Sequence, residues 1–213
     1  MTEPLQQDNE PHPVDAPEGI VSFRSMEHGT AADYALLDRY ERAHASGLVD
    51  RLFVALDRLS GSMGGYRITR LEHSLQSATR ARLDGADVDW VVAALLHDIG
   101  DDLAPDNHSE FAASIIQPYV RAEVHWVVQH HGVFQGYYYA HHLGGDRHAR
   151  DRFADHRWAG LCAGFCADWD QNSFDPDFPI HDLASFADDV HEVFARSAWA
   201  DDVIAVGNER LVP

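Results

Sequence analysis

The sequence predicts an all-α protein with one main domain. Apolar residues recur at intervals of three and four in a series of segments, and several segments carry helix start and stop signals. No segment alternates between apolar and polar residues over six positions, the pattern typical of a half-buried strand. Hydrophobic residues make up 45% of the 213 residues, which is enough for one sizeable core.

The predicted helices follow one another along the chain. Two are expected within residues 30–59, before Gly61, Gly64 and Gly65 interrupt the pattern. Six more segments have helical periodicity: 68–83, 88–99, 109–116, 120–131, 157–169 and 183–194. Caps support several of them: Asp87, Asn107 with Glu110 in a capping box, and the terminators Gly85 and Gly132.

Residues 132–155 interrupt this series. They contain three consecutive tyrosines, three histidines and a Gly144-Gly145-Asp146 turn. Loops of this length in compact domains are usually functional, so we expect a lid or a substrate wall over the site. We expect a helical domain over residues 21–200, a disordered tail rich in acidic residues and proline over 1–20, and a C-terminal tail over 201–213.

The charge of the chain excludes several classes of function. Asp and Glu number 35 and basic residues 16, and all 16 are arginine. With a net charge of −19 and no basic stripe, we expect neither nucleic acid nor an anionic membrane as a partner. The absence of lysine excludes Schiff-base and phosphate-loop lysine chemistry. No signal peptide or membrane span is evident, so we expect a cytoplasmic protein, and we interpret Cys162 and Cys166 as buried core residues.

Histidine and aspartate residues at helix ends predict a metal site. The helix VVAALLHDIG ends in a His-Asp pair, where a carboxylate would be costly to bury without a partner. Further histidines and one aspartate lie on apolar helix faces or at helix ends upstream and downstream. The set is His73, His97, Asp98, His108, His130 and Asp170. Four imidazoles and two carboxylates could hold two metals with Asp98 as the bridge, and they suit iron, manganese or zinc rather than magnesium or calcium.

Alternatives stand beside this set. A lone histidine on a helix is more often structural than ligating, and we adopt that interpretation for the remaining isolated histidines. Two ligand positions are ambiguous in the residue pattern, because His131 competes with His130 and Asp168 competes with Asp170.

The order of these residues resembles the HD-domain superfamily of all-α metalloenzymes over about residues 65–194. Within it, the chain looks most like the mixed-valence diiron oxygenases, the group that includes phosphonate-cleaving enzymes and myo-inositol oxygenase. LEHSLQSA is similar to the first, while HHLGGD and WDQNSFDPDFP are similar to stretches of the second. These similarities place the ambiguous ligands at His130 and Asp170.

The resemblance implies two iron ions, Fe(II) and Fe(III). One would be held by His73, His97 and Asp170, the other by His108 and His130, with Asp98 as the bridging and catalytic carboxylate. In that group a substrate hydroxyl binds one iron and O2 the other. The sequence departs from its relatives around the substrate: it lacks their lysines, and Met63 and Tyr66 occupy the positions of a Tyr and Glu gate.

The substrate contacts are therefore predicted from residue type and position. The candidates are Tyr66, Arg67, Gln135, Tyr137 and Arg147. Arg70, Tyr138 and Tyr139 are close to these candidates in the sequence and are also considered. In so acidic a chain, however, arginines often form surface salt bridges instead of binding a substrate.

The leading hypothesis is an oxygenase that uses two irons and O2 to cleave a bond at a hydroxyl-bearing carbon of a small polar substrate. The alternative is a two-metal phosphohydrolase or phosphodiesterase, with manganese or zinc. A metal-stabilised sensor domain is a third interpretation.

Overall fold

The computed structural model describes residues 18–213, and every regular element among them is helical. The predicted all-α class is therefore confirmed. The chain divides into two compact units, residues 1–48 and 49–213. Most of the tail expected over residues 1–20 lies outside the described residues, and the limits expected for the domain, 21 and 200, stay predictions.

The first unit contains one long helix, α1 (Ala31–Ser46). Thr30 and Asp33 form a capping box at its start, in which each side chain hydrogen-bonds to the other residue's backbone N–H. Asp33 also accepts hydrogen bonds from the backbone and hydroxyl of Ser22. The Thr30 hydroxyl and these further donors lower the pKa of the Asp33 carboxyl. The capping box therefore ties the preceding segment to the helix.

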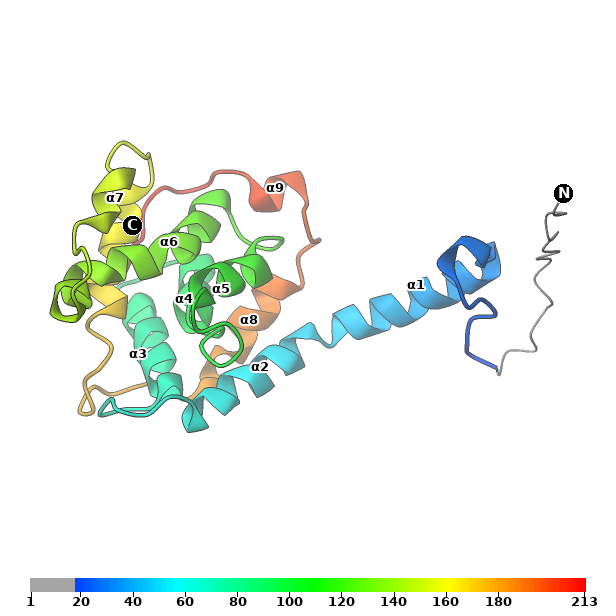
Figure 1. Ribbon diagram of the computed structural model, residues 1–213, viewed down its shortest axis with the longest axis horizontal. Helices are drawn as coiled ribbons and strands as arrows, with labels where there is room; N and C mark the ends of the chain where they lie inside the picture. Colours follow the sequence, from blue (N-terminus) through cyan, green and yellow to red (C-terminus); the bar gives the residue numbers. More distant parts are fainter. Residues whose placement is uncertain (1–17) are drawn as a thin grey trace, which may run out of the picture. The chain divides into compact units, whose positions relative to one another are not determined.

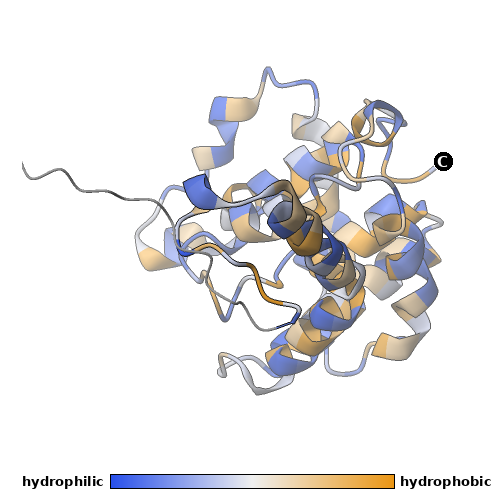
Figure 2. Ribbon diagram, turned by 90° about the vertical axis from the view of Figure 1, so that its right-hand side faces the viewer, coloured by the Kyte–Doolittle hydropathy of each residue, from blue (hydrophilic) through white to orange (hydrophobic). Residues whose placement is uncertain are grey.

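The second unit is a bundle built around α4 (Figure 1). Every residue of α4 from Asp89 to Leu96 is buried, and the helix packs against α3, α6 and α8. Most surrounding helices carry both hydrophobic and hydrophilic residues (Figure 2), as expected when one side faces a core. The helices are α2 (Leu48–Arg58), α3 (Arg70–Leu83), α4 (Val88–Leu96), α5 (His108–Ile116), α6 (Ala122–Tyr139), α7 (Ala159–Phe165), α8 (Ala187–Phe194) and α9 (Asp201–Ile204).

Helix α6 is longer than the sequence predicts. We expected Gly132 to end it and a long loop to follow, but the helix continues to Tyr139. A Cβ atom on Gly132 would lie 2.7 Å from the Ser109 hydroxyl oxygen, so the glycine is needed for close packing against α5 rather than for termination. Two short 3-10 helices follow, Ala140–Leu143 and Ala149–Phe153. The first third of the expected loop, residues 132–139, is therefore the last two turns of α6.

The segment expected as one helix over residues 157–169 changes its winding. After α7 the chain forms a π-helix, Cys166–Asp170, in which the Gln171 N–H bonds to the Cys166 carbonyl five residues back. Single π turns are rare and often occur at functional sites. Here the π turn ends on Asp170, one of the predicted metal ligands.

The C-terminal segment is anchored to the bundle by polar contacts. The indole N–H of Trp90 donates to the Arg210 carbonyl at 2.9 Å, and the Gly207 N–H donates to the buried carboxylate of Glu123. Arg121 pairs with Glu123 and with buried Asp89. The contacts of Gly207 and Arg210 hold the C-terminal segment against the bundle, for which the sequence pattern predicts no structure. No helix among residues 18–213 combines the length and hydrophobicity of a membrane span.

Candidate metal centre

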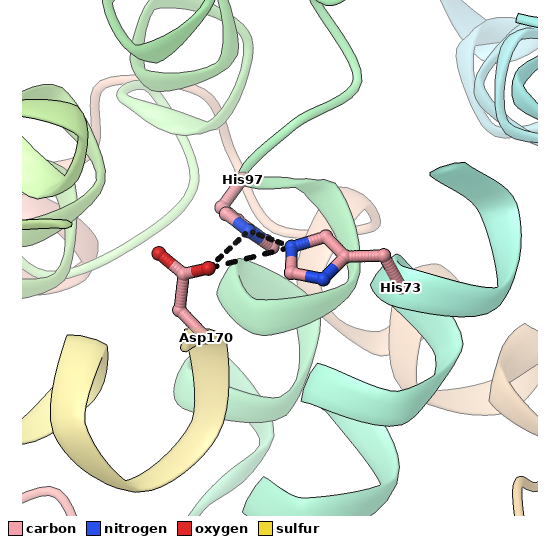
Figure 3. Close-up of side chains that lie close together, drawn as sticks. All are labelled: His73, His97 and Asp170. Atoms are coloured by element: carbon pink, nitrogen blue, oxygen red, sulfur yellow. Dashed lines mark hydrogen bonds and ion pairs between the residues drawn. The ribbon is translucent and has the colours of Figure 1, made fainter. Parts of the chain in front are cut away.

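Three of the predicted ligands meet at the centre of the bundle. His73 comes from α3, His97 follows the last turn of α4, and Asp170 ends the π-helix (Figure 3). The Nε2 atoms of the two histidines are 3.1 Å apart, and Asp170 Oδ1 lies 3.4 Å from His73 Nε2 and 3.8 Å from His97 Nε2. All three side chains are buried, and their donor atoms are close enough to share one ion.

Asp98 lies between this group and a second one. Its Oδ2 atom is 3.2 Å from the Nε2 atoms of both His73 and His97. Its Oδ1 atom is 3.2 Å from His131 Nε2 and 3.3 Å from His108 Nε2. Because each carboxylate oxygen faces a different pair of imidazoles, Asp98 has the geometry of a ligand that bridges two ions.

Hydrogen bonds orient the imidazole rings for ligation. The Nδ1 atoms of His73, His97 and His131 lie 2.7–2.8 Å from the backbone carbonyls of Ser173, Ala94 and Val128. A carbonyl oxygen can only accept, so each Nδ1 carries the proton and donates. The Nε2 lone pairs then face the cluster, the arrangement that metal-ligating histidines adopt.

The electrostatics of the cluster also favour positive charge at its centre. Burial opposes protonation of His73 and His97, but Asp98 and Asp170 outweigh it, so the pKa of each imidazole is raised. Burial likewise opposes ionisation of Asp98, but the imidazoles hold its pKa well below the usual value. Asp170 Oδ2 is buried and has no hydrogen-bond partner. Asp170 Oδ1 and the converging Nε2 atoms of His73 and His97 are the oxygen and nitrogen donors that a transition metal binds, so the donor set fits a metal.

The structure corrects one predicted ligand, because His131 and not His130 joins the cluster. Adjacent residues on a helix point about 100° apart, so only one of the two can face Asp98. His130 stacks instead on Trp126, with ring centroids 4.2 Å apart, and burial lowers its pKa. His131 continues the buried side of α6, four residues after Val127. In the sequence both His130 and His131 lie one turn after Val127, so this spacing alone does not choose between them. The other ambiguous position agrees with the sequence analysis, since Asp170 is buried in the cluster and Asp168 is exposed.

A buried arginine joins the cluster on the side of α3. Arg70 donates one N–H to Asp98 Oδ2 and another to Asp101 Oδ2, the latter at 2.6 Å. Asp101 Oδ1 is 3.7 Å from His108 Nδ1, and Asp98, Asp101 and His108 form a further group of potential ligands. The sequence analysis did not single out Asp101, although its position three residues after Asp98 places it one turn away.

A cavity of about 630 Å³ opens onto the cluster. Asp98, His108, His131 and Asp170 contribute to its wall, and the remaining lining residues come mainly from the segment before α3, the segment after Asp98, and α6. Substrate would therefore reach the cluster from this side.

Two of the five predicted substrate contacts line the cavity, Tyr66 and Gln135. Gln135 Nε2 donates to Asp170 Oδ1 at 2.9 Å. The other three, Arg67, Tyr137 and Arg147, are outside the lining, and their assignment stays a prediction. Arg67 is exposed, and Arg147 lies over the ring of Tyr137, 4.4 Å from its centroid. Their neighbours Arg70, Tyr138 and Tyr139 line the cavity instead.

An aromatic stack that the sequence analysis did not predict covers the first group of ligands. The Phe174 ring stacks on His73 with centroids 4.4 Å apart and on Tyr66 at 5.1 Å. Phe174 follows the WDQNS segment by one residue, so its proximity to Asp170 was its only signal. The stack keeps solvent away from His73 and forms one wall of the cavity.

Comparison with known families agrees with this geometry. The HD domain family model matches residues 70–170, which supports membership of the HD-domain superfamily. A search of curated proteins found no significant match. HD domains are metal-dependent enzymes, and the buried His and Asp cluster lies within the matched region and fits metal binding.

Proposed function

We propose that this HD-domain chain is a dinuclear iron oxygenase that uses O2 to cleave a bond at a hydroxyl-bearing carbon of a small polar substrate. The observation that carries the proposal is the position of Asp98, with one oxygen facing His73 and His97 and the other facing His108 and His131. This arrangement supports two ions joined by one carboxylate rather than a single ion.

The ligands fall into two groups, one for each ion. His73, His97 and Asp170 would hold one iron, and His108 and His131 the other, with Asp98 shared. With Fe(II) and Fe(III) bound, the pair supplies redox chemistry with O2 and lowers the pKa of a coordinated hydroxyl. In the second half, His108 and His131 contribute imidazoles beside the shared carboxylate, and both border the cavity. Coordination positions on that side would be open to small ligands.

The cavity wall would orient the substrate. Gln135 holds Asp170 through its amide N–H and has its carbonyl oxygen buried without a partner, so that oxygen can accept a hydrogen bond from a substrate donor. The Tyr66 and Phe174 rings would exclude water on the side of His73. This wall and the coordination of the substrate hydroxyl would together place the reacting carbon.

A two-metal phosphohydrolase is the alternative, since the same ligands could activate water for attack on phosphorus. Phosphate recognition commonly uses arginine or lysine. Among the described residues that line the cavity, the one such cation is Arg70, and its guanidinium already pairs with Asp98 and Asp101. This favours the oxygenase.

Metal analysis followed by spectroscopy tests the proposal. Protein purified from iron-supplemented cells should contain two irons per chain and, after partial reduction, give a mixed-valence EPR signal at low temperature. Oxygen uptake should accompany turnover of hydroxyl-bearing substrates.

Two results would contradict the proposal. Full turnover of phosphate esters without O2, supported by manganese or zinc, would show that the phosphohydrolase alternative is correct. One metal per chain at saturation would contradict the dinuclear assignment.

A further inference from the structure

The end of the π-helix and the residues after it position two ligands of the first ion. Asp170 is the last residue of the π-helix, and three residues later the Ser173 carbonyl accepts the Nδ1 proton of His73 at 2.8 Å. The winding of this turn therefore decides where both ligands lie. We infer that Asn172 is a positioning residue for the metal centre, because its side chain holds the turn in its π winding. The inference rests on the two-ion centre of the proposed function and not on the reaction.

The π turn changes which backbone groups bond to each other. In an α-helix the Gln171 N–H would donate to the Ala167 carbonyl, four residues back. Here it donates to the Cys166 carbonyl at 3.0 Å, five residues back. The Ala167 carbonyl therefore needs another donor, because backbone carbonyls in folded proteins are nearly always paired.

The side chain of Asn172 is one such donor. Its Nδ2 atom lies 2.8 Å from the Ala167 carbonyl and 3.3 Å from the Asp168 carbonyl, so it reaches two carbonyls of the turn. Its Oδ1 atom accepts a hydrogen bond from Gln171 Nε2 at 2.6 Å. The same Gln171 atom donates to the Ala167 carbonyl at 3.0 Å. Asn172 thus bonds both to the turn and to the second side chain that caps it.

The turn is also fastened to α3, the helix that carries His73. The Trp169 indole N–H donates to Asp84 Oδ2 at 2.8 Å, and Asp84 is the C-cap residue of α3. Arg80 of α3 donates to the backbone carbonyl of Asn172 at 3.0 Å. The position of the turn relative to α3 is therefore fixed on both sides of Asp170.

A change of winding would move the ligands. An α turn needs one residue fewer than a π turn, so the residues at its end would shift by one position, about 100° around the helix axis. Asp170 Oδ1 could then not remain 3.4 Å from His73 Nε2. Asn172 itself is exposed and lies outside the cavity lining, so its role is to hold the turn and not to contact substrate.

Metal binding by Asn172→Leu tests this inference. Leucine has about the size of asparagine but no donor. Wild type and variant are titrated with Co²⁺ without O2, and the visible absorption of the bound Co²⁺ and competition with a chelator report each ion. We expect one ion to bind about 10-fold more weakly in the variant, the loss typical when an outer hydrogen bond that orients a ligand is removed. The absorption of that ion should change, and the affinity of the other ion should change by less than about 3-fold.

Two further variants separate the hydrogen bond from other effects. Asn208→Leu is the matched control, because Asn208 is exposed in the C-terminal segment, and it should keep both affinities. Asn172→Ser restores a donor, since a serine hydroxyl can reach the carbonyl four residues back, as Ser173 does with Trp169. Asn172→Ser should bind the weakened ion about 3-fold or more tightly than Asn172→Leu does.

Three results would overturn the inference. The first is an unchanged affinity for both ions in Asn172→Leu. The second is an equal loss at both ions together with a less stable metal-free fold in urea, because a merely structural role produces that result. The third is binding by Asn172→Ser that is as weak as binding by Asn172→Leu.

The inference and the proposed function can fail separately, because Co²⁺ binding involves no turnover. Selective loss of one ion from Asn172→Leu, in a protein that hydrolyses phosphate esters without O2, would keep the inference and refute the oxygenase. An oxygenase with two irons whose metal affinities do not depend on Asn172 would do the reverse.

Discussion

Asp98 Oδ1 lies 3.2 Å from the Nε2 atom of His131, and this contact joins α6 to the end of α4. The backbone carbonyl of Val128 accepts the Nδ1 proton of the same ring, so the side chain is held from both ends. The neighbouring His130 is turned toward Trp126. Two adjacent histidines on one helix therefore have different surroundings, and substitutions at the two positions should have different effects.

We predict that His131→Ala loses one metal per chain and all activity, while the helical fold is kept. The reason is that the second half of the centre would retain only His108 beside the shared Asp98. His130→Ala is the matched control and should keep both metals. Metal content by mass spectrometry and helicity by circular dichroism decide the question. Loss of metal from His130→Ala with full retention in His131→Ala would refute this ligand assignment.

We predict that Gln135→Leu weakens metal binding by about 10-fold, because outer hydrogen bonds that orient a metal ligand typically contribute this much. The substitution keeps the approximate size of the side chain but removes the N–H that holds Asp170 Oδ1 at 2.9 Å. Gln129→Leu on the same helix is the control. Metal affinity is measured by competition with a chelator. An unchanged affinity in Gln135→Leu would mean that this hydrogen bond does not position Asp170.

Stabilisation by metal should increase with pH. In the metal-free protein, Asp98 and Asp170 raise the pKa values of His73 and His97 above 6.5 despite burial. A raised folded-state pKa contributes stability that is fully present below pH 6.5 and is lost as the pH rises through the folded-state value. Metal binding requires unprotonated Nε2 atoms and becomes stronger over the same window. The difference in Tm between metal-loaded and metal-free protein should therefore grow as the pH rises above 6.5. Thermal unfolding at a series of pH values measures it, and a constant or shrinking difference would contradict the prediction.

We predict that Arg121→Ala destabilises the fold by about 3 kcal/mol, because it leaves buried carboxylates with fewer partners. Arg121 lies 3.0 Å from Asp89 and 2.9 Å from Glu123, both buried. Arg157→Ala, which breaks an exposed pair with Glu209, should cost about 1 kcal/mol or less. Urea unfolding of the two variants gives the comparison. Equal losses would show that burial of the Arg121 network has no special effect.

The local pattern of the sequence was sufficient for most helices and for the types of ligand. Periodicity located α3, α4 and α5, and Asp87 caps α4 as predicted, but Asn107 at the start of α5 lacks the side-chain hydrogen bond of the predicted capping box. Thr69 and Glu72 form a capping box at the start of α3 that the sequence analysis did not single out. Burial of a His-Asp pair at the end of an apolar helix was also predictable, because such a carboxylate requires a partner. These features depend on residues within one or two turns of each other.

Only the tertiary structure decided which residues face the site. The rotation of α6 about its axis selects His131 over His130, and it depends on packing against α4 and α5. Gly132 was expected to end α6 but lies within the helix. A glycine is required there because Ser109 on α5 occupies the space that a side chain would need. Likewise Arg70 faces the cavity while Arg67 is exposed. The sequence alone thus determined the all-α class and the chemistry of the ligands, since both follow from local spacing. The choice among neighbouring candidates required contacts between elements distant in the chain, which no local pattern encodes.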